Sequence, residues 1–353
     1  MSKMAGRDKI AVIIPSFNGQ SYWPDLLPQL AAERYADFDL RIIIVDNNST
    51  DGSVAYIREH FPQFTLLISD TNLGYVGANN LGYEQAVQWG ASYVYLLNQD
   101  TLVEPGWLQP LYDFAKLHSF GSLQSKINLW PAKDEINTVG NVIHYLGFGY
   151  AGSLGIKDHF LPLIQRINYA SGAGVFLSVS VIQKLGRLFD KSMFAYLEDL
   201  DLGWILQIMG YDNYLIPQSQ IYHKYEFHRS IKQVYWFERN RLWVMLKNYR
   251  PATLVLIFPA WLIMELGQLF FAAINNWLGA KLRSYAWLFS AEAWKNLSAE
   301  RKLVQSLRQR SDRLVVGEFS GQILFQPLQG WFLKIANIFF NIYWLIVKQL
   351  IFW

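Results

Sequence analysis

The first hundred residues alternate short apolar runs with polar, helix-forming stretches, and this alternation restricts the chain to few folds. Runs of apolar and β-branched residues predict buried strands at 10–15, 40–46, 64–69 and 93–98. The stretches between and after them predict helices at 20–36, 52–60, 77–90 and 104–118. Because strands that alternate with helices form a mostly parallel sheet flanked by helices, we expect an α/β fold.

Polar motifs directly follow three of the predicted strands. They are Pro-Ser-Phe-Asn at 15–18, Asp-Asn-Asn-Ser-Thr-Asp-Gly-Ser at 46–53 and Asn-Gln-Asp at 98–100. Ligands of open α/β sheets bind outside the carboxyl ends of the strands. We therefore expect one rim of the sheet to carry all three motifs, an arrangement that suits a nucleotide with a diphosphate and a metal ion.

The residues after this alternation are less regular. Residues 120–180 are rich in Gly and Asn, which indicates a mixed region with an antiparallel component. Helices are predicted near 199–210, where acidic residues favour the helix start, and near 231–249. The chain has no cysteine, which excludes disulfides, thiolate metal sites and cysteine nucleophiles. Its net charge of +3 is too small to indicate a nucleic-acid partner.

The composition changes at Pro251, after which apolar and aromatic residues dominate. Residues 252–274 are almost uncharged, and a helix of this length could cross a bilayer core of roughly 30 Å. Residues 331–353 combine a broad apolar face, a narrow polar stripe and tryptophans, which is typical of a helix lying in the membrane interface. The basic stretch 281–313 between them favours the anionic cytoplasmic leaflet.

These features divide the chain into an α/β domain at 1–250 and a helical membrane-association region at 251–353. We expect the second region to hold the protein at the cytoplasmic face of the cell membrane, and a chain ending near Arg250 to be more soluble. A buried oligomer interface or a pair of core helices is the alternative, and a homo-oligomer stays open. The polar segment 1–9 and the short apolar run after it indicate no export signal.

Several polar residues near the predicted strand ends could bind a nucleotide. Asp46 could accept the ring N–H of uracil or thymine, and Asn48 could assist at the base or ribose. A polar turn that caps the next helix explains both residues equally well. The loop at 72–80 leads into a helix, and its glycines permit close approach to a ligand, although an ordinary strand-to-helix connection also fits.

Acidic residues supply candidates for metal binding and proton transfer. Asp100 is a carboxylate suited to Mg²⁺ or Mn²⁺, and Asn98 could contribute an amide oxygen or a bound water. Glu198 and Asp199 could include a general base of raised pKa, or could simply favour the start of a helix. His223 could ligate the metal or contact a phosphate, or could be structural. Three arginines could pair with diphosphate oxygens or face solvent or lipid: Arg229, Arg239 and Arg241.

The order and spacing of these motifs together resemble family 2 glycosyltransferases with the GT-A fold, and especially the rhamnosyltransferase-like branch. The resemblance covers about residues 8–250. Besides the three strand-end motifs, it rests on Asn-Leu-Gly at 72–74, Ser-Gly-Ala-Gly at 171–174, Glu-Asp-Leu-Asp-Leu at 198–202, His223, and Arg-Asn-Arg at 239–241. It implies a GT-A, Rossmann-like domain that acts as an inverting glycosyltransferase on a nucleotide-diphosphate sugar with Mg²⁺ or Mn²⁺.

The resemblance also implies roles for individual residues. Asp100 would bind the metal with His223, and Asp199, next to Glu198, would deprotonate the acceptor hydroxyl. The residues implied to contact the donor are Pro15, Ser16, Asn18, Asp46, Asn48, Asn72, Gly74, Asn79 and Asn98. The acceptor or the donor sugar would lie near Ser171, Gly172, Ala173 and Gly174.

Two features depart from the family pattern. Asn98 stands where the family often has Asp, and Ile205 and Leu206 stand where an Arg commonly follows the acidic helix start. We still expect activity, with a dTDP- or UDP-linked sugar such as rhamnose as donor and a lipid-linked glycan or polysaccharide as acceptor. A polyprenyl-phosphate acceptor is one alternative, although it needs no base such as Asp199. A non-catalytic membrane scaffold that binds sugar nucleotides is the other.

Overall fold

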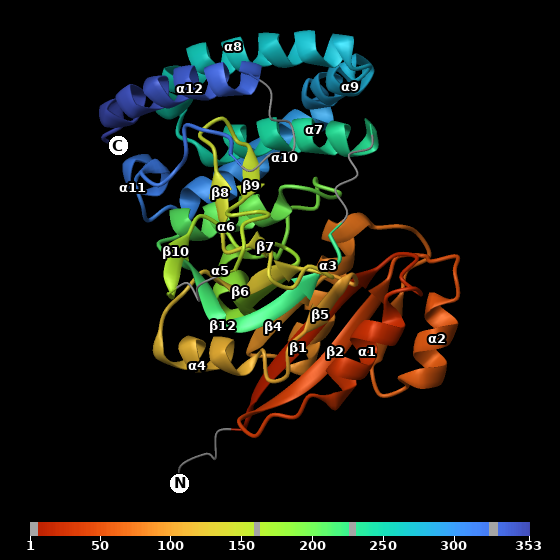
Figure 1. The fold of residues 1–353 in the computed structure, drawn as a ribbon. Helices are drawn as coiled ribbons and strands as arrows, with labels where there is room; N and C mark the ends of the chain where they lie inside the picture. The colour runs from red at the N-terminus through yellow and green to blue at the C-terminus, as the bar shows by residue number, and fades with distance from the viewer. Residues whose placement is uncertain (1–5, 159–162, 226–230, 325–330) are drawn as a thin grey trace.

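The computed structural model describes residues 6–158, 163–225, 231–324 and 331–353. Within these ranges the chain forms a ten-stranded mixed sheet flanked by helices, with a layer of further helices stacked over one end (Figure 1). The path through the sheet is β10-β12-β6-β11-β4-β1-β2-β3. The predicted α/β fold is therefore confirmed.

The first half of the sheet is parallel, as predicted. Its strands are β1 (Asp8–Ser16), β2 (Phe38–Asp46), β3 (Thr65–Ile68) and β4 (Tyr93–Leu97), and β1 pairs in parallel with both β2 and β4. The intervening helices are α1 (Trp23–Ala32), α2 (Ser53–His60) and α3 (Gly74–Trp89), and α4 (Gln109–Leu117) comes after β4 and the short strand β5 (Thr101–Val103). All residues of β1 from Ile10 to Ser16 are buried, as expected for a strand covered on both faces.

The second half of the sheet contains the predicted antiparallel component. Strand β11 (Gly174–Ser178) runs antiparallel between β4 and β6 (Ser122–Leu129), and β12 (Asn213–His223) runs parallel to β6. Three short strands add to this half: β5 (Thr101–Val103), β7 (Ile136–Thr138) and β10 (Gln165–Ile167). A separate hairpin joins β8 (Asn141–Ile143) to β9 (Gly149–Ala151).

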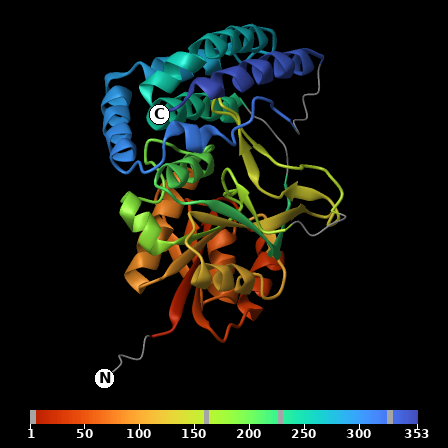
Figure 2. The same cartoon turned by 90° about the vertical axis from the view of Figure 1, so that its left-hand side faces the viewer.

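Alternate residues of β1 point into two cores. Ile10, Val12 and Ile14 pack against α1, α2 and α4, whereas Ala11 and Ile13 belong to the core under α3. The second core continues through α5 (Val179–Leu185) and α6 (Glu198–Ile208) into the helical layer. That layer contains α7 (Ile231–Asn248), α8 (Pro251–Ile274), α9 (Leu278–Leu288), α10 (Ala291–Ser306), α11 (Asp312–Val316) and α12 (Trp331–Leu350) (Figure 2).

The helical layer includes α7, which precedes the predicted domain boundary at residue 250; the boundary itself stays a prediction. Glu238 and Arg241 of α7 form buried ion pairs with Lys281 of α9 and Glu265 of α8, respectively. An aromatic contact also crosses the predicted boundary, because Trp204 of α6 packs edge-on against Phe319. A chain ending near Arg250 would uncover this core, so the expectation that it would be more soluble is not supported.

Only some of the basic side chains of the stretch 281–313 are exposed at the surface. Lys281 is buried, Arg301 donates to the Leu246 carbonyl, and Arg310 pairs with Asp212. Arg283, Lys295, Lys302 and Arg313 are the exposed cations of this stretch. In the described ranges one helix, Pro251–Ile274, has the length and apolar composition of a membrane span.

Candidate active site

The three strand-end motifs interlock at one rim of the sheet. Ser16 and Asp46 are register partners at the ends of β1 and β2. The Asn18 amide donates to Ser49 Oγ at 2.9 Å, and Asn18 Oδ1 accepts from the Thr50 amide at 2.9 Å. In the third motif, the Gln99 side chain forms hydrogen bonds of 3.0 and 3.1 Å with the Phe17 backbone. The predicted common rim is therefore present.

Three of the twelve buried side-chain polar atoms without partners in the described residues belong to the strand-end motifs of this rim. Within the described residues, Ser16 Oγ, Asp46 Oδ1 and Asn98 Oδ1 are buried and make no hydrogen bond. The other carboxylate oxygen of Asp46 accepts from the Ser49 amide at 2.9 Å, which fixes the side chain. An unsatisfied buried polar atom costs about 1–3 kcal/mol, so such atoms are expected where a ligand supplies the missing partners.

The loop before α3 connects the rim to a second segment. Gly74 has φ +70°, and an added Cβ would collide with the carbonyl oxygen of Phe194, so only glycine fits here. Asn72 Oδ1 accepts from the Gly74 amide at 2.8 Å, and Asn47 donates to the Gly74 carbonyl at 3.3 Å. Asn79 is fully buried and donates to the Tyr75 carbonyl inside α3, while its Oδ1 has no hydrogen-bond partner, so its contact with a donor stays a prediction.

Asp100 and His223 come together where β12 meets β5. His223 Nε2 lies 3.2 Å from Asp100 Oδ1, and the Lys224 amide donates to the Asp100 carbonyl at 2.8 Å. Burial opposes ionisation of Asp100, but His223 and Lys224 outweigh it and hold its pKa below the usual range. Nδ1 of His223 lies 3.4 Å from Asn137 Oδ1, so the imidazole has a polar neighbour at each ring nitrogen. No sequence pattern had indicated Asn137.

The Asp100–His223 pair suits a divalent metal that is completed by a substrate. Mg²⁺ and Mn²⁺ commonly take one or two protein carboxylates and share substrate phosphate oxygens. The described residues contain no cluster of three or more His, Asp or Glu side chains that could hold a metal without such help. The unpartnered Asn98 Oδ1 belongs to the same strand-end motif and offers one further oxygen.

A second carboxylate pair opens helix α6. Tyr196 and Leu197 have φ values of 70° and 64° and turn the chain into Glu198 and Asp199. Asp199 accepts from the Gly172 amide at 3.0 Å and from the Leu200 amide at 2.7 Å. Burial raises the pKa of Asp199 despite these bonds, and burial together with the charge of Asp199 raises the pKa of Glu198 well above its usual value.

The segment 171–174 joins the two carboxylate sites. Besides the Gly172 bond to Asp199, the Ala173 carbonyl accepts from the Asn98 amide at 3.2 Å. Tyr75, which the sequence did not single out, donates its hydroxyl to the Gly172 carbonyl at 2.6 Å. The segment Ser171, Gly172, Ala173 and Gly174 thus contacts both the Asn98–Asp100 motif and Asp199, and its place beside a sugar stays a prediction.

The arginines do not join this site. Arg229 lies outside the described residues. Arg239 is sandwiched between the rings of Trp236 and Trp287, at 4.3 and 4.2 Å, and donates to the Ser192 carbonyl. Arg241 is 1% exposed and pairs with Glu238 and Glu265. Because both guanidinium groups are committed to these contacts, the predicted phosphate-binding role of Arg239 and Arg241 is not supported.

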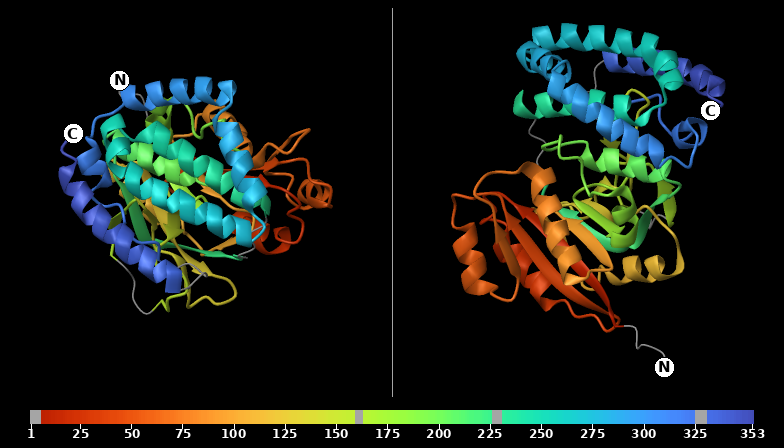
Figure 3. Two further views of the ribbon diagram at one scale, coloured as in Figure 1. Left: turned by 90° about the horizontal axis from the view of Figure 1, so that it is seen from above. Right: turned by 180° about the vertical axis from the view of Figure 1, so that it is seen from behind.

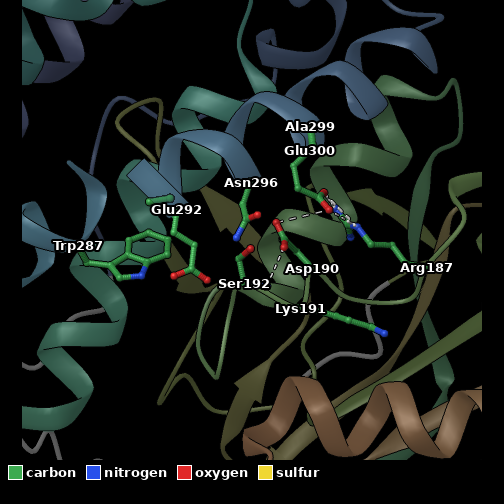
Figure 4. Close-up of a pocket in the computed structure, with 10 residues that line it drawn as sticks. Arg187, Asp190, Lys191, Ser192, Trp287, Glu292, Asn296, Ala299 and Glu300 are labelled. Atoms are coloured by element: carbon green, nitrogen blue, oxygen red, sulfur yellow. Dashed lines mark hydrogen bonds and ion pairs between the residues drawn. The ribbon is translucent and has the colours of Figure 1, made fainter. Parts of the chain in front are cut away.

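One cavity lies apart from the rim. It measures about 480 Å³ and lies between the 187–192 segment and helix α10 (Figure 4). An ion pair between Arg187 and Glu300 stands on its wall. None of its lining residues belongs to the strand-end motifs or to the α6 carboxylates, so the chemistry described above has to be sought at the rim.

Residues 11–137 match the family described as glycosyl transferase family 2. The chain is 25% identical over 214 residues to N-acetylglucosaminyl-diphospho-decaprenol L-rhamnosyltransferase of Mycobacterium tuberculosis, covering 55% of this chain and 68% of that protein. It is 25% identical over 256 residues to the O-antigen biosynthesis protein RfbC of Myxococcus xanthus, covering 70% of this chain and 19% of that one.

Solved structures show the same fold. GalNAc-T7 with UDP, GalNAc and Mn²⁺ superposes with a TM-score of 0.55 at 14% identity, over 69% of this chain and 48% of that chain. Staphylococcus aureus TarS superposes with a TM-score of 0.50 at 16% identity, over 97% of this chain and 55% of that chain. The chain thus spans about half the length of these two solved proteins. Both likenesses establish the GT-A architecture of the sheet and its flanking helices.

Proposed function

We propose that this chain, a family 2 glycosyltransferase of the rhamnosyltransferase-like branch, moves a sugar from a nucleotide-diphosphate sugar to a hydroxyl of a lipid-linked glycan or polysaccharide, with inversion. The observation that carries the proposal is that the segment 171–174 contacts both the Asn98–Asp100 motif and the candidate base. The Ala173 carbonyl accepts from the Asn98 backbone N–H, and the Gly172 amide orients Asp199. Asp100 of that motif pairs with His223.

In the proposed reaction, the acceptor oxygen attacks the anomeric carbon directly and the nucleoside diphosphate leaves from the opposite side. Asp199 takes the proton of the acceptor hydroxyl, a role that a raised pKa favours because the carboxylate then binds a proton more strongly. Asp100 and His223 would hold the divalent metal. When bound, that metal offsets the charge growing on the leaving diphosphate.

The unpartnered atoms of the rim give the nucleoside its contacts in this proposal. Asp46 Oδ1 would accept a ring N–H of uracil or thymine, and Ser16 Oγ and Asn98 Oδ1 would meet the rest of the donor. A dTDP- or UDP-linked donor, rhamnose among the possible sugars, is therefore proposed. GalNAc-T7, the solved protein with the higher TM-score, was solved with UDP and Mn²⁺.

The acceptor proposal rests on the C-terminal helices and on the mycobacterial relative, whose name describes a lipid-linked acceptor. Large apolar side chains are exposed along α8 and α12, which supports attachment to a membrane; the cytoplasmic face is part of the proposal. A polyprenyl-phosphate acceptor is already ionised and has no use for an oriented base, so Asp199 favours a hydroxyl acceptor.

The test combines donor binding with turnover. We expect Asp100→Ala to abolish the Mn²⁺-dependent part of donor binding in calorimetric titration, and Asp199→Asn to keep donor binding while lowering transfer by about 10² or more. Asp113→Asn, an exposed carboxylate on α4, is the matched control and should change neither quantity.

Two outcomes would contradict the proposal. Near-normal transfer by Asp199→Asn would show that Asp199 is not the base. Equal donor affinity of Asp100→Ala and the parent would show that Asp100 does not bind the metal. A parent protein that binds donor but neither hydrolyses nor transfers it, with or without metal, would indicate the scaffold alternative.

A further inference from the structure

Helices α8 and α12 together present one apolar face, here called the α8–α12 face. The two helices lie side by side across the end of the molecule, and both are seen lengthwise from above (Figure 3). Tyr343 donates to the Leu256 carbonyl at 2.6 Å, and Trp353 donates to Thr253 Oγ1 at 2.9 Å, which ties the pair together. Its exposed members are Val255, Phe258, Leu262, Leu266, Phe270, Ile274, Ile335, Ile338, Ile342, Leu345, Ile346 and Leu350.

The opposite side of α8 is anchored to the protein along most of its length. Near its start, Thr253 donates to Asp312 Oδ2 at 2.6 Å. Ile257 and Ala260 are buried in the next turns. Further along, Glu265 pairs with Arg241 and with Lys281, and all three side chains are buried. If α8 left this position to cross a bilayer, the Glu265 carboxylate would enter lipid without a partner, and Arg241 and Lys281 would lose this carboxylate inside the protein.

We infer that α8 does not cross the membrane but lies along it beside α12, so that the α8–α12 face rests in the interfacial region of one leaflet. At 1.5 Å per residue, the helices present apolar strips about 36 and 30 Å long. Glu265 is the only charged residue of α8, and it points inward. The charged residues of α12 are Lys334 and Lys348, near its two ends.

These charges fit an anionic lipid surface better than a second copy of the chain. A symmetric dimer would place the same face against itself, and neither helix offers an outward carboxylate to meet Lys334 or Lys348. Anionic headgroups would meet both lysines while the apolar strips enter the acyl region. The inference rests on the proposed function for the presence of a membrane, but its test reads insertion depth and is independent of transfer.

The absence of native cysteine makes a depth measurement clean. Single cysteines at Val255, Leu262 and Phe270 of α8 would carry a fluorophore, and full-length protein would be bound to phosphatidylcholine–phosphatidylglycerol vesicles with quenchers at graded depths. We expect the same shallow depth at all three positions, with every label on the outer side of sealed vesicles. Leu117→Cys on α4, also exposed, should stay unquenched as the control.

A depth that rises from Val255 to Leu262, with labels at the two ends of α8 on opposite sides of the vesicle, would overturn the inference in favour of a span. Failure to float with vesicles, accompanied by a doubled mass in solution, would overturn it in favour of a dimer. As a further check, Leu266→Glu with Ile342→Glu should reduce vesicle binding at least tenfold, whereas Leu117→Glu should leave it unchanged.

A separate observation concerns the turn that delivers the candidate base. Tyr196 and Leu197 are consecutive non-glycine residues with positive φ, directly before Glu198 and Asp199. Asn240 of α7 is fully buried, and its Nδ2 donates to the carbonyls of Ala195 and Tyr196 at 2.9 and 2.8 Å. Such backbone conformations persist only where the surrounding structure holds them.

We propose that Asn240 is a positioning residue for Asp199, which rests on the proposed function. Both amide hydrogens of Asn240 are used on this turn, and its Oδ1 accepts from Arg239 Nε at 3.0 Å, so the amide orientation is fixed. Removing the amide should let the turn relax and displace the carboxylate of Asp199, which touches the acceptor in the proposed reaction. A displacement of this kind lowers turnover without affecting the donor's metal site.

We expect Asn240→Ala to lower kcat about tenfold or more and leave the donor KM unchanged. Asn80→Ala is the matched control, because Asn80 is also a buried amide bonded to a loop, at Phe189. It should lower stability without lowering kcat. A glycine at position 196, introduced by Tyr196→Gly, adopts a positive φ without support from Asn240. Adding Asn240→Ala to Tyr196→Gly should therefore lower kcat much less than Asn240→Ala lowers it in the parent.

An equal loss of kcat in Asn80→Ala, or an undiminished loss in the Tyr196→Gly background, would show that Asn240 acts only on stability. This outcome differs from failure of the proposed function, in which Asp199→Asn itself would retain transfer.

Discussion

Replacing Lys247 with Met tests the buried ion network under α6. The Lys247 ammonium is fully buried and donates to Asp190 Oδ2 at 2.7 Å and to Asp201 Oδ2 at 2.6 Å. Methionine keeps the shape of the side chain but leaves two buried carboxylates without this cation. Breaking a buried pair by removing one partner costs about 3–5 kcal/mol, so we expect a loss of that size in the free energy of unfolding near pH 7.

The loss should depend on pH in a defined direction. Burial opposes ionisation of Asp190, but Lys247 and Arg187 outweigh it and hold its pKa below the usual range. A lowered pKa gives stability above the unfolded pKa of about 3.9, and this stability is lost as pH falls through the folded pKa. The variant lacks that contribution, so its difference from the parent should be full above about pH 4 and should shrink as the pH falls below about 4, towards the lowered folded pKa of Asp190.

The matched control is Lys157→Met. Lys157 also meets two carboxylates, Asp134 at 2.7 Å and Glu135 at 3.1 Å, but its side chain is 49% exposed. Urea unfolding followed by tryptophan fluorescence should show no measurable change for this control. The reasoning would be refuted if Lys247→Met and Lys157→Met gave the same free energy of unfolding at neutral pH.

Three further outcomes are expected. Burial and the charge of Asp199 raise the pKa of Glu198, so the full stability of the parent is present below the unfolded pKa of about 4.3 and part of it is lost as the pH rises through the folded pKa. Glu198→Gln removes this loss and should therefore raise the thermal midpoint more near pH 8 than near pH 4. An equal rise at both pH values would contradict this. Asn98→Asp adds a carboxylate to the motif of Asp100 and should strengthen Mn²⁺-dependent donor binding in calorimetry, while weaker binding would count against the metal position. A chain ending at Arg250 should bind a hydrophobic dye and lose near-ultraviolet circular dichroism; a compact, soluble product would show that the helical layer is dispensable.

The sequence was sufficient for the parts of the structure that local patterns decide. Each of the four predicted strands in the first hundred residues is present. A short apolar run followed by turn residues can form few structures other than a buried strand. Asp100 and His223 were paired from the family motif, although 123 positions apart, and the structure places them 3.2 Å apart. Asp199 is likewise singled out by its motif as the candidate base, a role that stays a prediction, and its bond to Gly172 joins the motif at 198–202 to the motif at 171–174.

The sequence could not show which way the charged residues of the helical layer face. Arg241 was predicted to meet a diphosphate, but its carboxylate partner Glu265 lies on α8, a helix whose composition indicates a membrane span. Lys281 and Arg310 looked like a basic surface, yet each pairs with a carboxylate from a distant part of the chain. Composition gives the number of charged residues. Whether each charged side chain faces the core or the solvent depends on how the helices pack, which no local sequence pattern encodes.

The stacking of Tyr145 on Trp344 has a consequence for how the protein is made. The two rings lie 4.6 Å apart and only 3° from parallel, yet roughly 200 residues separate them in the chain. A ribosome adding about 5–20 residues per second needs about 10–40 s to supply that stretch. During this interval Trp344 has not yet been synthesised, and the surface around Tyr145 stays exposed. A chaperone therefore has time to bind the nascent chain there. Slower translation of the last third of the chain would lengthen this exposure.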